Sequence, residues 1–219
     1  MSDERKNEKS AAKKVVLIVL IAAVVITALY FLPYDKILAA LFPKEEPQQE
    51  DIYFYEPDFE RNILLDPAYL AMDRYISFRK GSETFVVTDG DYEKLGKDAA
   101  VIAKYIDALV RGDAKAYNAL FTESYLKENG KQAEFPMQKI YGISAELYGQ
   151  HTFTEEELDG KYTGVTQYRY QLNYCIDEND GTVRRDMGSG VSAPIFLELL
   201  SDPETGAIRI NSIAFLQNK

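Results

Sequence analysis

The residues best suited to acid–base chemistry are few in this sequence. The only histidine is His151, in the polar stretch GQHTFTEEE, which predicts an exposed strand end or loop. The three glutamates at 155–157 are consecutive, so their side chains point in different directions and fit a solvated loop better than a metal cage. This stretch therefore predicts neither a catalytic pair nor a metal site.

Three other short patterns resemble known sites but lack a required part. Residues 177–181 (DENDG) are one residue short of a calcium-loop spacing, which favours a plain turn. Ser124 and Lys127 match S-x-x-K, yet no K-T-G follows. The single cysteine, Cys175, cannot form an intramolecular disulfide, and no histidine is placed to activate it. We predict no catalytic residue, no metal ligand and no cofactor.

A row of tyrosines is the one feature that suggests a binding surface. Period-two alternation in a predicted strand at 162–176 places them on one face. The candidate residues are Tyr162, Tyr168, Tyr170 and Tyr174. Rings with apolar bodies and hydroxyl tips suit either a ligand pocket or a partner surface. The other interpretation is a core face packed against helices, with hydroxyls that reach solvent at its edge.

Helices that could cover this tyrosine face are predicted before the strand. Residues 91–111 carry apolar side chains at i, i+3, i+4 and i+7, which predicts a helix. Gly112 can end it in the left-handed conformation, and Asp113 can cap a second, aromatic helix after a two-residue corner. A third short helix is predicted at 136–141, because proline suits a first helical position.

From residue 143 onward the apolar period changes to two, which predicts strands. After the strand at 162–176, further strands are predicted at 191–199 and 208–216, joined by turns. Helices followed by an antiparallel meander indicate an α+β domain at 91–219, with the helices packed on one face of a curved antiparallel sheet.

Residues 52–90 form a predicted N-terminal extension of this domain. It contains the aromatic stretch IYFYEPDF and a short helical turn near 66–72. A hairpin is predicted in which 75–79 pairs with 84–88 around Lys80, Gly81 and Ser82.

The N-terminus predicts a membrane anchor. Residues 15–32 (VVLIVLIAAVVITALYFL) are uncharged and just long enough to cross a hydrocarbon core. A cleavable signal peptide is the alternative, but the run is long for one and ends in bulky residues. Five basic residues in the tail at 1–14 place that tail in the cytoplasm, so a proline-punctuated linker at 33–51 leads to an extracytoplasmic domain in a single-pass protein.

Composition excludes one class of partner. The whole chain has a net charge of −10. The tail holds five basic and three acidic residues, which leaves a net charge of −12 on the rest. Such a surface repels nucleic acid, so none is expected as a partner.

Residues 105–125 (YIDALVRGDAKAYNALFTESY), followed by long strands, resemble the nuclear transport factor 2-like family. The marker is a helix, a Gly-Asp corner and an aromatic second helix. The resemblance covers about 91–217 and implies a cone of helices wrapped by a bent sheet. The anchored arrangement also resembles uncharacterised clostridial membrane proteins and the bitopic assembly factors of conjugation and type IV secretion machines. In having a single cysteine, the chain resembles extracytoplasmic proteins of Gram-positive bacteria, which often lack disulfides.

Three functions are compatible with this arrangement, because the fold alone does not give one. We expect a non-enzymatic interaction or assembly domain that presents a surface to another extracytoplasmic or membrane protein; a homo-oligomer is compatible with this. The alternative is a binding module whose cone holds a small molecule or cell-wall fragment. An isomerase- or hydrolase-type enzyme is the third reading.

Overall fold

The computed structural model describes residues 52–87 and 90–215, which belong to one compact unit. The predicted tail, anchor and linker at 1–14, 15–32 and 33–51 lie outside the described residues. Within the described ranges, no helix combines the length and the apolar character needed to cross a membrane.

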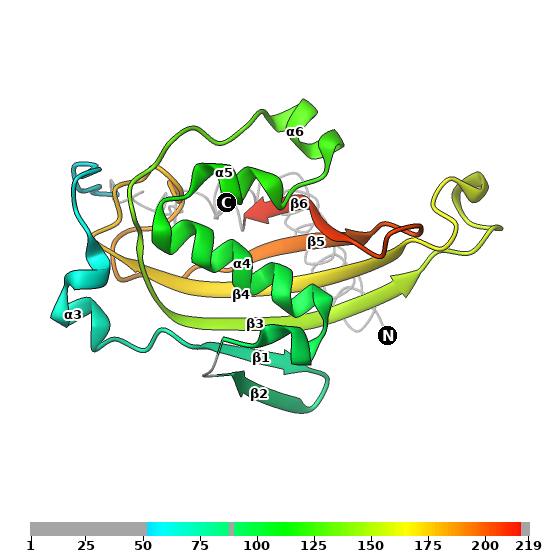
Figure 1. The fold of residues 1–219 in the computed structure, drawn as a ribbon, viewed down its shortest axis with the longest axis horizontal. Helices are drawn as coiled ribbons and strands as arrows, with labels where there is room; N and C mark the ends of the chain where they lie inside the picture. The colour runs from blue at the N-terminus through cyan, green and yellow to red at the C-terminus, as the bar shows by residue number, and fades with distance from the viewer. Residues whose placement is uncertain (1–51, 88–89, 216–219) are drawn as a thin grey trace, which may run out of the picture. The chain divides into compact units, whose positions relative to one another are not determined.

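The described part is an α+β fold built on one mixed sheet (Figure 1). Within it, the six strands follow the order β2-β1-β3-β4-β5-β6. The strands are β1 (Ile76–Lys80), β2 (Glu83–Val87), β3 (Lys139–Thr152), β4 (Thr166–Asp177), β5 (Ile195–Ser201) and β6 (Ile208–Phe215). The strands β4 and β5 both begin later than the sequence pattern predicted.

The antiparallel sheet predicted for residues 91–219 is confirmed for its own strands, but the hairpin of the predicted extension joins it and makes the whole sheet mixed. The pairs β3–β4, β4–β5 and β5–β6 are antiparallel, but β1 pairs with β3 in parallel. The connection from β2 to β3 leaves and re-enters the sheet at the end where β1 begins, so β3 runs antiparallel to β2 and parallel to β1. Hydrophobic alternation reveals strands but not this long-range pairing.

The hairpin itself is confirmed. Lys80 pairs with Glu83 and Ile76 with Val87, so Gly81 and Ser82 form a two-residue turn. Gly81 has φ +62°, a conformation that glycine adopts without steric cost. Local turn chemistry therefore sets this register.

The helices occupy the N-terminal part and the long connection between β2 and β3. They are η1 (Ile63–Leu65), α3 (Pro67–Leu70), η2 (Tyr92–Leu95), α4 (Lys97–Arg111), α5 (Ala114–Ala119) and α6 (Glu123–Asn129), with η3 (Leu158–Gly160) between β3 and β4. Figure 1 shows α4 lying across the sheet, over β3 and β4. The apolar face of α4 packs into the core against the sheet, with Ile102, Tyr105 and Leu109 among its buried residues.

The predicted corner after α4 is confirmed. Gly112 ends the helix in the left-handed conformation, with φ 65° and ψ 26°, and the Asp113 carboxylate accepts the N–H of Ala116 at 2.8 Å. The predicted helix at 91–111 is interrupted once, at Gly96, whose φ of 116° separates η2 from α4.

The helix predicted at 136–141 is wrong, because this segment runs extended into β3. A Cβ at Gly112 would lie only 2.9 Å from the Phe135 carbonyl oxygen, so the segment passes tightly against the end of α4. The N–H of Gln138 donates to the carbonyl of Leu109 at 3.2 Å. This hydrogen bond joins the segment to the C-terminal turn of α4, so the segment follows α4 and does not form a helix of its own.

Candidate functional site

The four tyrosines of the predicted row lie in three environments. Tyr170 and Tyr174 are fully buried on the face of β4 that packs against α4. Tyr168 is half-buried at the edge of the same core. Tyr162 precedes the strand, and its ring lies 5.7 Å from that of Phe153. The row therefore does not form a single open surface.

Tyr170 takes part in a buried polar contact that sequence reasoning missed. Its hydroxyl donates to Asp98 Oδ2 at 2.5 Å, and the Lys80 ammonium donates to the same oxygen at 3.0 Å. Burial and the nearby carboxylate raise the pKa of Tyr170 far above its ordinary value. Only 5% of Asp98 is exposed, so this contact between β1, α4 and β4 is structural.

His151 lies exposed near the end of β3, as predicted. Its Nε2 lies 2.9 Å from Glu157 Oε1. The other oxygen of Glu157 accepts the N–H of Thr154 at 2.8 Å, so this carboxylate holds a turn. Over residues 52–87 and 90–215, no cluster of three or more His, Cys, Asp or Glu side chains could hold a metal ion.

The candidate site is a cleft of about 360 Å³ formed by three segments that are distant in sequence. One wall comes from residues 53–63, another from 136–139 before and at the start of β3, and the third from 177–180 at the end of β4. Five carboxylates line it, namely Glu56, Asp58, Asp177, Glu178 and Asp180. We call it the acidic cleft, because Arg61 and Lys139 are the only bases among the described residues that line it.

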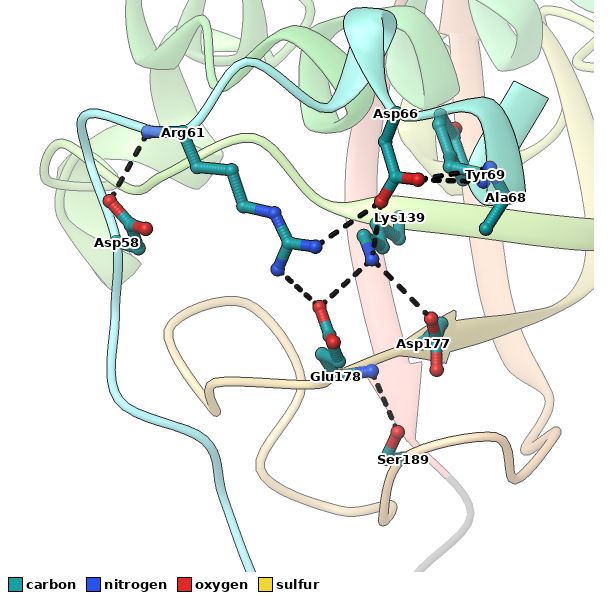
Figure 2. Close-up of polar contacts among 9 residues, drawn as sticks. All are labelled: Asp58, Arg61, Asp66, Ala68, Tyr69, Lys139, Asp177, Glu178 and Ser189. Atoms are coloured by element: carbon teal, nitrogen blue, oxygen red, sulfur yellow. Dashed lines mark hydrogen bonds and ion pairs between the residues drawn. The ribbon is translucent and has the colours of Figure 1, made fainter.

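An ion-pair network lies at the floor of the acidic cleft (Figure 2). The Lys139 ammonium lies 2.9 Å from Asp66 Oδ2, 2.9 Å from Glu178 Oε2 and 3.7 Å from Asp177 Oδ2. Arg61 bridges the same carboxylates, because it pairs with Glu178 and lies 3.2 Å from Asp66. The network therefore ties the N-terminal segment to β3 and to the end of β4.

Contacts within the network favour the charged forms of Lys139, Asp66 and Glu178. Burial alone would lower the pKa of Lys139, but its hydrogen bonds to Asp66 and Glu178 outweigh burial and raise it. The hydrogen bond from Lys139 holds the pKa of Asp66 at about 2, and the same lysine lowers the pKa of Glu178. Lys139 stays protonated at neutral pH, so it is neither a nucleophile nor a general base.

We predict that acid weakens the attachment of the N-terminal segment. The pKa of Asp66 and of Glu178 is lower in the folded state than in the unfolded chain. Their stabilising contribution is therefore complete above the unfolded pKa values near 4 and is lost as pH falls toward about 2. Urea unfolding followed from about pH 7 to about pH 2.5 should show this loss, and Asp66→Asn should flatten it. Equal pH dependence in the two proteins would contradict the assignment.

The third wall of the cleft is a loop that is held by hydrogen bonds among its own residues. Glu178 has φ 52°, an uncommon conformation for this residue type, and its N–H donates to Ser189 Oγ at 2.7 Å. Asn179 is fully buried and donates to the carbonyls of Arg184 and Met187 at 2.9 and 2.8 Å. These contacts fix the direction in which the carboxylates of the loop point.

The N-terminal segment also docks through its backbone and one ring. The N–H of Tyr55 donates to the carbonyl of Asn179 at 2.9 Å. Phe54 packs on Gly181, where an added Cβ would lie 2.9 Å from the Phe54 ring. A side chain at position 181 would therefore push the segment away.

Gly181→Ala tests this docking. Gly181 has φ +73°, so alanine suffers backbone strain there in addition to the clash with Phe54. Gly130 is a matched control, because it has φ +81° and open space around it. We expect Gly181→Ala to lower the free energy of unfolding by about 1 kcal/mol more than Gly130→Ala, and to speed amide exchange at Tyr55. Equal losses in urea unfolding would show that the Phe54 contact is unimportant.

The rim of the acidic cleft is aromatic and exposed. Tyr53 is 73% exposed and Tyr55 41%. Their rings meet edge to face, with centroids 5.3 Å apart. Glu56 and Asp58 follow directly in the chain and also line the cleft. The arrangement combines exposed rings with surplus negative charge, which suits recognition of a cation.

Sequence signals for this site existed but were weak. Asp66 precedes Pro67 and caps α3, accepting the N–H of Ala68 at 3.0 Å, and an Asp-Pro pair typically starts a helical turn. Lys139 opens a strand as a charged residue that becomes buried. Nothing local links these residues to Glu178.

No family model, no curated protein and no solved structure matches this chain.

Proposed function

We propose that this chain is a membrane-anchored, extracytoplasmic interaction domain without catalytic activity, which binds another envelope or membrane protein through its N-terminal segment. The observation that carries the proposal is a concentration of exposed apolar side chains. Among the residues that the structure describes, seven of the twelve large exposed hydrophobics fall between 52 and 75. They are Ile52, Tyr53, Tyr55, Phe59, Leu65, Leu70 and Tyr75. Exposed apolar residues concentrated in one segment of the chain favour that segment as a contact surface for a partner.

The proposed anchor at 15–32 would keep the N-terminal segment of the domain close to the membrane. A helix there would hold the domain at the membrane, and the linker at 33–51 would lead directly into residue 52. The positive tail supports a cytoplasmic N-terminus. The first exposed side chains after the linker would then lie within reach of another membrane protein.

We also propose that the domain is nuclear transport factor 2-like. An α+β fold with α4 packed across the sheet supports this, as does the glycine–aspartate corner after α4. In such a cone the ligand space would lie between helices and sheet. Here Tyr170 and Tyr174 are fully buried in that region, which favours an interaction domain over a module that holds a ligand in its interior.

The test is recovery of the partner from membranes solubilised in mild detergent. The full-length protein would be compared with Tyr53→Ser/Tyr55→Ser and with a control, Tyr148→Ser/Leu158→Ser, which removes exposed apolar side chains elsewhere. We expect about a tenfold or greater loss of the partner for the first pair, since truncated aromatic anchors commonly weaken interfaces that much. The control pair should recover as much as the wild type. Equal recovery in all three proteins would contradict the proposal.

A further inference from the structure

We infer that the acidic cleft recognises a lysine- or arginine-bearing segment of the protein partner. This inference rests on the proposed function and specifies the chemistry of the partner. It is carried by the charge of the cleft, the state of its basic residues and the aromatic rim.

The charge of the cleft favours a cation. Five carboxylates line it against two bases, which leaves a surplus of three negative charges. The chain beyond the predicted tail is acidic as well, with a net charge of −12. Attraction at long range and at the site therefore has the same sign, which speeds the encounter with a basic partner.

The two basic residues of the cleft are already paired with carboxylates, so they offer an anion few unpaired N–H groups. The Lys139 ammonium lies 2.9 Å from the Asp66 and Glu178 carboxylates and forms a longer ion pair, at 3.7 Å, with Asp177. Arg61 pairs with two of the same groups. An anionic ligand would have to displace these pairs, whereas a cation would not.

The free acceptors lie at the aromatic rim. Within the described part of the chain, no hydrogen bond or ion pair engages the Glu56 carboxylate. Asp58 uses only Oδ1, which accepts the N–H groups of Glu60 and Arg61 at 3.0 and 3.2 Å. Tyr53 and Tyr55 stand beside these groups with exposed rings, so an ammonium or guanidinium group can meet a carboxylate and a ring face together.

The experiment measures binding of a labelled hexalysine peptide to the full-length protein in detergent by fluorescence anisotropy. Glu56→Gln/Asp58→Asn removes the two rim charges while Asn keeps the acceptor at position 58. The matched control is Glu155→Gln/Glu156→Gln, which removes two exposed charges from the connection between β3 and β4. We expect hexalysine to bind at least about fivefold more weakly to the first variant and within about twofold of the wild type to the second. A hexaglutamate peptide should not bind.

Equal weakening in both double variants would overturn the inference, because it would show general attraction to an acidic surface. Absence of hexalysine binding to the wild type would overturn it as well. Two further outcomes distinguish failure of this inference from failure of the proposed function. If Tyr53→Ser/Tyr55→Ser abolishes partner recovery while Glu56→Gln/Asp58→Asn leaves both readouts unchanged, the interaction surface stands and the cationic chemistry is wrong. If neither variant alters partner recovery, both proposals fail.

Discussion

Lys139→Ala is expected to lower the free energy of unfolding by about 3 kcal/mol, because it removes a buried cation and leaves its carboxylates without that partner. The Lys139 side chain is 7% exposed and faces Asp66, Asp177 and Glu178. Repulsion among these carboxylates should also loosen the N-terminal segment, which is held to β3 through this lysine. Urea unfolding measures the loss of stability, and amide exchange at Tyr55 measures the loosening.

A matched control is available in the same sheet. Arg79 lies 3.5 Å from Glu146, but both side chains are well exposed, so Arg79→Ala should cost less than about 1 kcal/mol. If Lys139→Ala cost no more than Arg79→Ala, the network at the floor of the cleft would not hold the segment in place.

Tyr170→Phe is expected to destabilise the domain by about 2 kcal/mol, although it removes a single oxygen atom. The Tyr170 hydroxyl donates to Asp98 Oδ2 at 2.5 Å. Without it, Lys80 is the remaining donor to Asp98 Oδ2. Thermal or urea unfolding would measure the change. The cost arises because a buried charge loses a hydrogen bond that water cannot replace.

The control for this prediction is the neighbouring tyrosine on the same face of β4. Tyr168 is half-buried, and its hydroxyl has no hydrogen-bond partner in the described part of the chain. Tyr168→Phe should therefore change stability by less than about 0.5 kcal/mol. Similar losses for the two variants would mean that the contact with Asp98 contributes little.

Features set by neighbouring residues could be predicted from the sequence. The register of the β1–β2 hairpin follows from Gly81, which can adopt positive φ in a two-residue turn. The corner after α4 follows from Gly112 and Asp113, because each satisfies backbone groups at a helix end. The exposed position of His151 follows from the polarity of its neighbours.

Features set by contacts between distant segments could not be predicted. Alternation within β1 and β3 is the same whether they pair in parallel or antiparallel fashion, so the mixed sheet gives no local signal. The helix predicted after Pro136 fails because the end of α4 holds that segment in another path.

The candidate site shows the same limit. Arg61, Lys139 and Glu178 come from three separate segments, and each alone resembles an ordinary surface charge. The tyrosine row is different, because burial of Tyr170 and Tyr174 agrees with the interpretation of this strand face as a core face packed against helices. The pattern alone left that interpretation and an open surface both possible.

Photo-crosslinking from position 53 in the full-length protein, in intact membranes, would reveal whether the N-terminal segment contacts another protein. A crosslinking amino acid would replace Tyr53, and a control protein would carry it in place of Tyr148 on β3, which is also exposed. We expect one defined adduct with another envelope or membrane protein from position 53 and none from position 148. The same adducts from both positions, or none from position 53, would contradict the proposed function.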